Sequence, residues 1–182
     1  MTRMDIHSER GQHAHAAAQY MAGELGHRWC WTWFPTPSER GKAAARADGC
    51  FVAYHPARSI QAVAECKARS QPRAFFDTVS TYPGHYVITE DKITHGRAAS
   101  VALGVPFLLL AYLVPDMAAY VFPISNHDGE LLVEYERART PTKATVNGGT
   151  ALRDNAYISF EYARMYDLRS ERAEQIAATF PL

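Results

Sequence analysis

The sequence predicts an α/β fold in which a mixed β-sheet carries helices on its faces. Three observations support this prediction: an Ala-rich segment near the start, two neighbouring strand-like segments joined by a short turn, and a continuous apolar run after a second helix-like segment. The expected order is helix, three strands, helix and buried strand. A C-terminal elaboration rich in β-strands is expected to follow.

Length and composition fit one globular domain over residues 1–182, with a core over about 8–124 and an elaboration over about 125–182. The chain is 47% hydrophobic and 21% charged, which is enough apolar material for a sizeable core. Its net charge is zero, so no long-range attraction to a polyanion is expected and nucleic-acid binding would depend on local basic clusters. The candidates, each with an ordinary solvated surface as its alternative, are Arg40, Lys42 and Arg46; Arg69 and Arg73; and Arg137, Arg139 and Lys143.

The cysteines and the apolar segments predict a cytoplasmic protein without membrane association. The three cysteines form no CxxC pair and lie in apolar or aromatic stretches, which indicates buried thiols in a reducing compartment. No apolar leader follows the first residue. The longest apolar run, residues 101–114, is interrupted by Gly104 and Pro106, whereas a membrane-spanning helix needs roughly 20 residues.

The first quarter of the chain predicts a helix followed by an aromatic strand. Residues 8–25 are Ala-rich, with Ser8 as a candidate N-cap and Gly26 as a stop signal. Residues 28–34 have the composition of a strand, and Pro35 ends it. We expect the tryptophans of this segment to lie in the core or on the sheet surface, in preference to stacking on nucleobases.

A predicted antiparallel hairpin carries the most informative residues. Its strands are residues 49–54 and 60–68, joined by a tight connection, and Asp48 stands at the entrance of the first strand. Because side chains two apart share a face of a strand, Glu65 and Lys67 should point the same way and Cys66 to the opposite face. The hairpin should bring Asp48 towards Glu65 and Lys67, so that two carboxylates and a lysine converge.

The second half of the chain predicts one helix and further strands. Residues 91–104 fit a helix that Thr89 or Asp91 could cap, with a loose apolar face of Ile93, Ala98, Val101 and Ala102. Residues 107–114 are apolar throughout, which predicts the central strand of the sheet, buried on both faces. The remaining expectations are an irregular segment over 70–90 with a short strand at 86–88, strands at 118–123, 131–135 and 157–162, a loop over 141–150, and a closing helix over 169–179.

The residues of the hairpin resemble the PD-(D/E)xK nuclease superfamily. Its motif is an Asp at the start of one strand followed by Asp or Glu, any residue, and Lys on the next; here the motif is Asp48 and then Glu65, Cys66 and Lys67. The segment VAECKAR is similar to the corresponding strand of archaeal Holliday junction resolvases, and residues 91–114 are similar to the segment after the motif in that group and in phage-borne relatives. The order of elements over about 8–124 fits the same fold. One departure is Ala47, where the family pattern has Pro.

The resemblance implies a restriction-endonuclease-like fold and a metal-dependent nuclease acting on DNA, including branched or otherwise structured DNA. The implied catalytic residues are Asp48, Glu65 and Lys67, and the implied ligands of Mg²⁺ or Mn²⁺ are Asp48, Glu65 and the backbone carbonyl of Cys66. Resolvase-like relatives act as dimers, so a homodimer is also implied. Many members carry an acidic residue on the first helix, where this sequence offers Glu9 and Glu24, and the residues do not decide between them.

Two other interpretations remain open at this point. The chain could be a nuclease-fold protein without cleavage that serves as a nucleic-acid-binding or assembly module. Asp48, Glu65 and Lys67 could also form a structural ion pair at a strand end in an unrelated α/β protein. Lys92, His95 and Arg97 on the second helix could contact a phosphate backbone beside the site or form a solvated helix face.

Overall fold

A computed structural model describes residues 9–36, 47–53, 59–78, 82–141 and 152–180. A six-stranded mixed sheet forms its centre, with the strand order β1-β2-β3-β5-β6-β9. A second sheet has the order β4-β8-β7. The strands are β1 (Trp31–Pro35), β2 (Gly49–Ala53), β3 (Ile60–Arg69), β4 (His85–Thr89), β5 (Phe107–Leu113), β6 (Ala118–Ser125), β7 (Tyr135–Pro141), β8 (Leu152–Ser159) and β9 (Arg164–Asp167).

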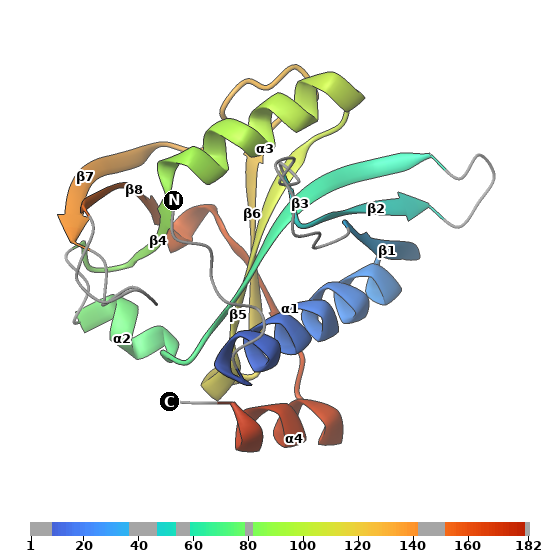
Figure 1. Cartoon of the computed structure of the whole chain (residues 1–182), viewed down its shortest axis with the longest axis vertical. Helices are drawn as coiled ribbons and strands as arrows, with labels where there is room; N and C mark the ends of the chain where they lie inside the picture. Colours follow the sequence, from blue (N-terminus) through green and yellow to red (C-terminus); the bar gives the residue numbers. More distant parts are fainter. Residues whose placement is uncertain (1–8, 37–46, 54–58, 79–81, 142–151, 181–182) are drawn as a thin grey trace.

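Helices cover both faces of the large sheet, with α1 on one side of β3 and α3 on the other (Figure 1). The helices are α1 (Glu9–Arg28), α2 (Arg73–Thr78), α3 (Glu90–Leu103) and α4 (Glu171–Thr179), with short 3-10 turns η1 (Val114–Asp116) and η2 (Phe160–Tyr162). The mixed α/β architecture expected from the sequence is therefore observed.

Strand pairing follows the predicted hairpin and central strand. β2 and β3 are antiparallel, β3 and β5 are parallel, and β6 pairs with β5 antiparallel. The parallel pair needs a crossover, which α2, β4 and α3 supply between β3 and β5. β5 is buried along almost its whole length, as its continuous apolar sequence predicts.

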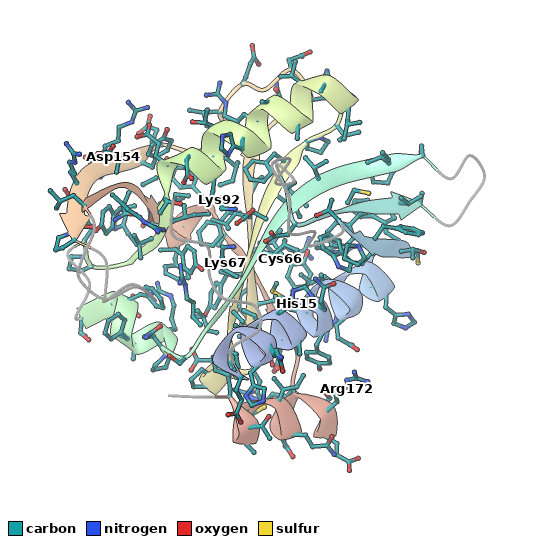
Figure 2. All side chains as sticks on the ribbon, viewed as in Figure 1. His15, Cys66, Lys67, Lys92, Asp154 and Arg172 are labelled. Atoms are coloured by element: carbon teal, nitrogen blue, oxygen red, sulfur yellow. The ribbon has the colours of Figure 1, made fainter. Side chains whose placement is uncertain are left out.

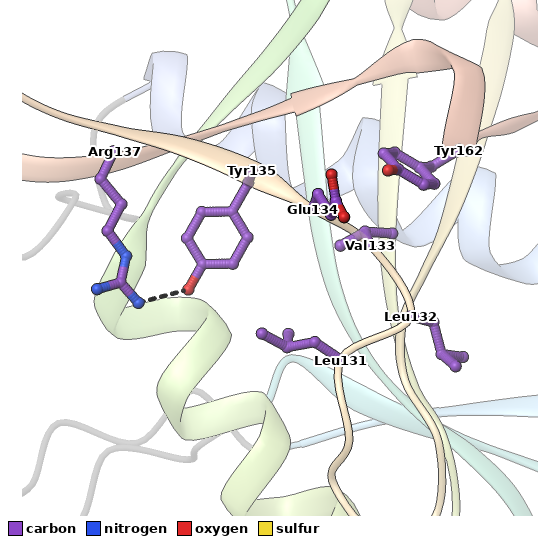
Figure 3. A pocket seen from close by; sticks show the side chains of 7 residues that line it. All are labelled: Leu131, Leu132, Val133, Glu134, Tyr135, Arg137 and Tyr162. Atoms are coloured by element: carbon purple, nitrogen blue, oxygen red, sulfur yellow. Dashed lines mark hydrogen bonds between the residues drawn. The ribbon is translucent and has the colours of Figure 1, made fainter.

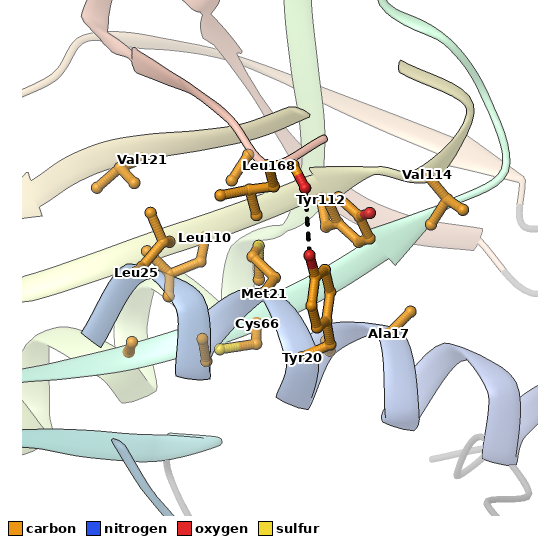
Figure 4. Close-up of a cluster of buried hydrophobic side chains, with 14 of the residues drawn as sticks. Ala17, Tyr20, Met21, Leu25, Cys66, Leu110, Tyr112, Val114, Val121 and Leu168 are labelled. Atoms are coloured by element: carbon orange, nitrogen blue, oxygen red, sulfur yellow. Dashed lines mark hydrogen bonds between the residues drawn. The ribbon is translucent and has the colours of Figure 1, made fainter. Parts of the chain in front are cut away.

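Two apolar cores lie on opposite faces of the large sheet. The first joins α1 and α4 to the side of β3 that carries Ala62, Ala64 and Cys66. Figure 4 shows this core, where the hydroxyl of Tyr20 on α1 donates a hydrogen bond to the carbonyl of Leu168 at 3.2 Å. The second core joins α3 and the small sheet to the other side. Residues after 125 thus contribute to both cores.

Several element boundaries differ from the sequence-based predictions. The first helix continues through Gly26 to Arg28; a side chain at Gly26 would approach the carbonyl of Trp31 to 2.8 Å, so this glycine permits close packing and does not end the helix. The turn falls at Cys30, whose φ is +57°. Cys30 is exposed and only Cys66 is buried, which corrects the prediction of three buried thiols.

In the second half, the strand predicted at 131–135 is wrong. Leu131 makes an isolated bridge to Ser125, and the strand β7 begins at Tyr135. The strand-like segment at 157–162 is divided between β8 and η2, while α2 and β9 were not predicted. The buried face of α3 consists of Ile93, Gly96 and Ser100, not of Val101 and Ala102, which are exposed. The loop predicted over 141–150 lies almost wholly outside the described residues.

The tryptophans of the first strand pack as expected. Trp29, Trp31 and Trp33 all contact the ring of Phe51 on β2, with ring centroids 4.9–6.0 Å apart. They cover the end of the core beside α1. In the described part of the chain, no helix is long and apolar enough to cross a membrane.

Candidate functional site

Asp48 is held at the entrance of β2 by bonds to both neighbouring strands. Its N–H donates to the carbonyl of Ala64 at 2.9 Å, and its own carbonyl accepts from the N–H of Thr36 at 2.9 Å. Its side-chain Oδ2 accepts the N–H of Cys66 at 2.8 Å. The carboxylate is therefore oriented towards β3 by a charge-assisted hydrogen bond and stays partly exposed.

Gly49, directly after Asp48, allows β1 and β2 to approach each other. A Cβ atom there would lie 2.4 Å from the ring of Trp33 and 2.5 Å from the carbonyl of Phe34. The indole N–H of Trp33 donates to Gln19 on α1 at 2.6 Å, which fixes the ring in this position. The backbone that carries Asp48 is thus clamped between β1 and β3.

Glu65 and Lys67 leave β3 on the face opposite to Cys66, as the two-residue period predicts. The Glu65 side chain is 1% exposed, and its Oε1 lies 2.5 Å from the Lys67 Nζ. The same Nζ lies 3.5 Å from Asp48 Oδ2. The convergence of two carboxylates and a lysine, expected from the hairpin, is present in the structure.

A second lysine reaches the buried carboxylate from α3. The Nζ of Lys92 in the first turn of this helix lies 3.1 Å from Glu65 Oε1. Figure 2 labels Lys67 on β3 and Lys92 on α3, on the side of the sheet that faces this helix. From the sequence, Lys92 could contact a phosphate backbone or belong to a solvated helix face, and its contact with Glu65 was not predicted. No spacing rule links the two residues, because they belong to different elements.

The other two candidates on α3 have different surroundings. Arg97 donates to the carbonyl of Gly129 at 2.7 Å and so ties the helix to the turn after β6. His95 is exposed. Of the three residues considered on this helix, the structure brings Lys92 to the cluster.

The charges of the cluster change the pKa of Lys67. Burial acts to lower it, but the negative charges of Glu65 and Asp48 outweigh that effect and raise the pKa above its ordinary value. Lys67 is therefore an ammonium at neutral pH in the metal-free protein. Burial, assisted by the two carboxylates, raises the pKa of the Cys66 thiol well above its usual range.

The donor set fits a divalent cation that takes few protein ligands. Mg²⁺ uses oxygen ligands, often only one or two carboxylates, and keeps several waters. Glu65 Oε1 is buried and, among the described residues, accepts no hydrogen bond of good geometry, although two ammonium groups lie near it. Among the described residues no group of three or more His, Cys, Asp or Glu side chains could hold a metal ion. A cation here would depend on Asp48, Glu65 and a backbone oxygen such as that of Cys66.

The two first-helix candidates lie on the helix that packs against the Cys66 face of β3. Glu9 is exposed at the start of α1, and Glu24 is half-buried near its end. Within the described part of the chain, neither makes an ion pair with Lys67 or Lys92. The structure brings neither residue into the cluster.

The basic clusters named from the sequence are largely engaged in contacts within the fold. Arg69 donates to the Tyr86 hydroxyl and the Val87 carbonyl at 3.0 and 3.1 Å. Arg73 pairs with Asp77, and its guanidinium lies over the Phe160 ring. Arg137 contacts Glu90 at 2.8 Å. Residues 40, 42, 46 and 143 lie outside the described residues.

A hollow of about 560 Å³ lies between the start of β7 and η2 (Figure 3). None of the residues that line it belongs to the lysine–carboxylate cluster. The lining consists of Leu131, Leu132, Val133, Glu134, Tyr135, Arg137 and Tyr162. Arg137 donates to the Tyr135 hydroxyl at 3.2 Å on its rim. The candidate site and the hollow are therefore separate features.

Comparison of the chain with protein-family models, curated proteins and solved structures finds no match. The structure by itself establishes a mixed α/β architecture with a six-stranded mixed sheet and a second three-stranded sheet.

Proposed function

We propose that the protein is a divalent-metal-dependent nuclease of the PD-(D/E)xK type that hydrolyses phosphodiester bonds in DNA, with branched or otherwise structured DNA among its substrates. The observation that carries this proposal is the cluster of Asp48, Glu65 and Lys67 across two paired strands. Lys67 Nζ lies 2.5 Å from one carboxylate and 3.5 Å from the other.

The position of the cluster supports the proposal beyond its composition. Burying a carboxylate as fully as Glu65 is unfavourable unless its charge is compensated, and buried ion pairs are often no more stable than apolar packing. If the pair had only a structural role, apolar residues at the same positions would stabilise the fold at least as well. A buried, charged cluster beside a partly exposed carboxylate is instead typical of a site whose charged groups bind a ligand or take part in catalysis.

The order of elements around the cluster supports the same proposal. α1, β1, β2 and β3 are followed by α3 and then by β5, which pairs parallel to β3. A restriction-endonuclease-like fold, which belongs to this proposal, would have the order helix, three strands, helix and strand, and the chain follows that order with α2 and β4 as additional elements. Ala47 is the departure from the motif, and its main chain still accepts a hydrogen bond from the Thr36 hydroxyl at 2.8 Å.

Each residue of the cluster has a role in this proposal. Asp48, Glu65 and the carbonyl of Cys66 would hold Mg²⁺ or Mn²⁺, which supplies an activated water and stabilises negative charge on the phosphate. Lys67 would orient or deprotonate the attacking water, or donate to the phosphate oxygen on which charge develops. Asp48 and Glu65 also hold the Lys67 ammonium between them, so its position is defined before substrate binds.

A homodimer belongs to the same proposal, through the resemblance to resolvases. Exposed apolar side chains in the C-terminal half would supply surface for such an interface, among them Leu132, Leu152 and Met165.

A nuclease-fold protein that binds nucleic acid without cutting it is the second candidate. The specific observation in its favour is charge balance: Asp48 and Glu65 are already matched by Lys67 and Lys92. The whole chain also has no net charge, whereas dedicated DNA-binding proteins usually carry a basic excess. Binding without cleavage is the result that separates this candidate from the first.

The test is cleavage of labelled linear duplex, single-stranded, nicked, flap and four-way-junction DNA, together with RNA, in the presence of Mn²⁺. Wild-type protein is compared with Glu65→Ala and with Glu174→Ala, which removes an exposed carboxylate on α4. We expect cutting by the wild type and by Glu174→Ala that is lost in Glu65→Ala. Binding without cutting by folded wild type would support the second candidate, and equal cutting by all three would exclude this site.

A further inference from the structure

Two cations approach the buried carboxylate of Glu65. Its Oε1 is approached by Lys67 Nζ at 2.5 Å and by Lys92 Nζ at 3.1 Å, from a strand and a helix that meet only in the folded protein. Lys67 is shared between Glu65 and Asp48, so Lys92 completes the charge balance of the two carboxylates. Ordering this second long side chain costs conformational entropy, and its role in the balance depends on the charge that the carboxylates carry.

Lys67 and Lys92 differ in their other contacts. Lys67 also faces Asp48 and is therefore held by two carboxylates. Within the described residues Lys92 makes an ion pair only with Glu65, and its side chain is 32% exposed. An ammonium group has three donors on a flexible stem, so Lys92 can turn towards another anion.

The charges of the four groups indicate which anion that would be. Two carboxylates and two ammonium groups sum to zero. When the carboxylates hold a divalent cation, the same set carries a charge of about +2 and the attraction between Glu65 and Lys92 is weakened. The partly exposed ammonium then favours an anion from outside the protein, and the phosphodiester groups of a bound strand are the anions that the proposed substrate supplies.

We propose that Lys92 is a phosphate-positioning residue that serves as the counter-ion of Glu65 in the metal-free protein and contacts a backbone phosphate of the bound DNA once Glu65 holds a cation. This inference rests on the proposed function, because it assumes that Glu65 binds metal and that DNA occupies the site. In this proposal α3 carries the residue that couples metal binding to the binding of the DNA strand.

The first arm of the test is thermal unfolding in EDTA and in Mn²⁺, without DNA. Lys92→Met should melt about 2–4 °C below the wild type in EDTA, since Glu65 loses one of its two cations. In saturating Mn²⁺ the difference should shrink, because the bound cation replaces the missing charge and stabilises the folded state by linkage. Arg164→Met, which removes an exposed cation on β9, should shift both melting temperatures equally.

The second arm is the salt dependence of binding to a labelled DNA duplex, with Ca²⁺ in place of Mn²⁺ to limit cutting. Loss of one phosphate contact should weaken binding by roughly threefold to tenfold and reduce the slope of log K against log [salt] by about 0.9. Lys92→Arg should retain the wild-type slope, since the guanidinium also binds phosphate.

The outcomes separate this inference from the proposed function. Wild-type protein that binds Mn²⁺ and DNA, with a Lys92→Met variant of unchanged salt slope or an unchanged melting difference in Mn²⁺, would overturn the role of Lys92 and leave the nuclease proposal standing. Folded wild-type protein that binds neither Mn²⁺ nor DNA would overturn the proposed function and this inference with it. A smaller melting difference in Mn²⁺ together with a reduced slope would support both.

Discussion

At the scale of single residues, the properties of the cluster depend on how Glu65 is buried. A carboxylate with 1% of its side chain exposed carries a large desolvation cost, and the two lysines offset it. Asp48 is different because it is partly exposed and takes the Cys66 N–H as a donor. The pair therefore combines a fixed, buried oxygen with one that solvent or substrate can reach.

Lys67→Ala should separate chemistry from folding. If the proposed nuclease function holds, we expect it to lower the cleavage rate by about 10²–10⁴-fold, because it removes the group that is proposed to act on the water or the phosphate. The fold should survive, since Lys92 remains beside Glu65. Single-turnover cleavage, duplex binding and circular dichroism of the same preparation would measure the three properties. Cleavage at the wild-type rate would remove Lys67 from the mechanism.

The proximity of Asp48, Glu65 and Lys67 could be predicted from the sequence because local rules decide it. The two-residue period of a strand places Glu65 and Lys67 on one face, and a short hairpin returns the chain beside Asp48. The contact of Lys92 with Glu65 could not be predicted in this way. It depends on how α3 lies across the sheet, and the packing that fixes this angle involves residues far apart in the sequence.

At the scale of elements, the position of α3 depends on a close approach to β5. A Cβ atom at Gly96 would lie 2.2–2.5 Å from the ring of Phe107 at the start of that strand. Gly96 is one turn after Lys92, so the approach that seats the helix also sets the distance from Lys92 to Glu65. Glycine is needed here for space, since its backbone is helical.

Gly96→Ala should displace α3 and destabilise the protein by about 1–3 kcal/mol, the usual cost of overpacking. Gly23→Ala provides the matched control, because no described residue packs within 4 Å of a Cβ at that position in the interior of α1. It should stabilise the protein by about 0.5–1 kcal/mol through helix propensity. Urea unfolding of the two variants would measure both effects. A Gly96→Ala protein as stable as Gly23→Ala would contradict the packing described here.

Elements with strong local patterns were predicted, and those that depend on distant partners were not. The alternation of β3, the helix start and stop signals around α3 and the continuous apolar run of β5 predicted these elements, and their observed bounds lie close to the predicted ones. β9 is four residues long and exists through its pairing with β6. Apolar composition predicted a strand at 131–135, but the side chains of Leu131 and Leu132 are exposed, so composition alone was misleading there.

At the scale of the whole molecule, the C-terminal segment closes the large sheet and one of its cores. β9 pairs with the edge of β6, and Leu168 and Ala173 are buried against α1. Arg28 donates to the carbonyl of Asp167 at 2.5 Å, and Trp29 donates to the Tyr166 hydroxyl at 3.2 Å. These contacts join residues separated by more than half of the chain.

Truncation after Ala163 should therefore destabilise the protein by about 3 kcal/mol or more, because several large apolar side chains lose their cover. Tyr20→Phe is the graded comparison: it removes the hydroxyl that bonds to Leu168 and keeps the packing. It should cost about 1 kcal/mol. Chemical denaturation followed by far-ultraviolet circular dichroism would measure both. A truncated protein with wild-type stability would show that the segment does not contribute to the folded core.

Mn²⁺ binding measured by isothermal titration calorimetry would test a metal site at Asp48 and Glu65 without any knowledge of the substrate. The comparison is wild type against Asp48→Asn, in which the remaining amide oxygen can still accept the Cys66 N–H and so keep the local structure. Saturable Mn²⁺ binding by the wild type, weakened at least about tenfold in Asp48→Asn, is the predicted result. Equal binding by both proteins, or no binding by folded wild type, would contradict a metal-dependent site at Asp48 and Glu65.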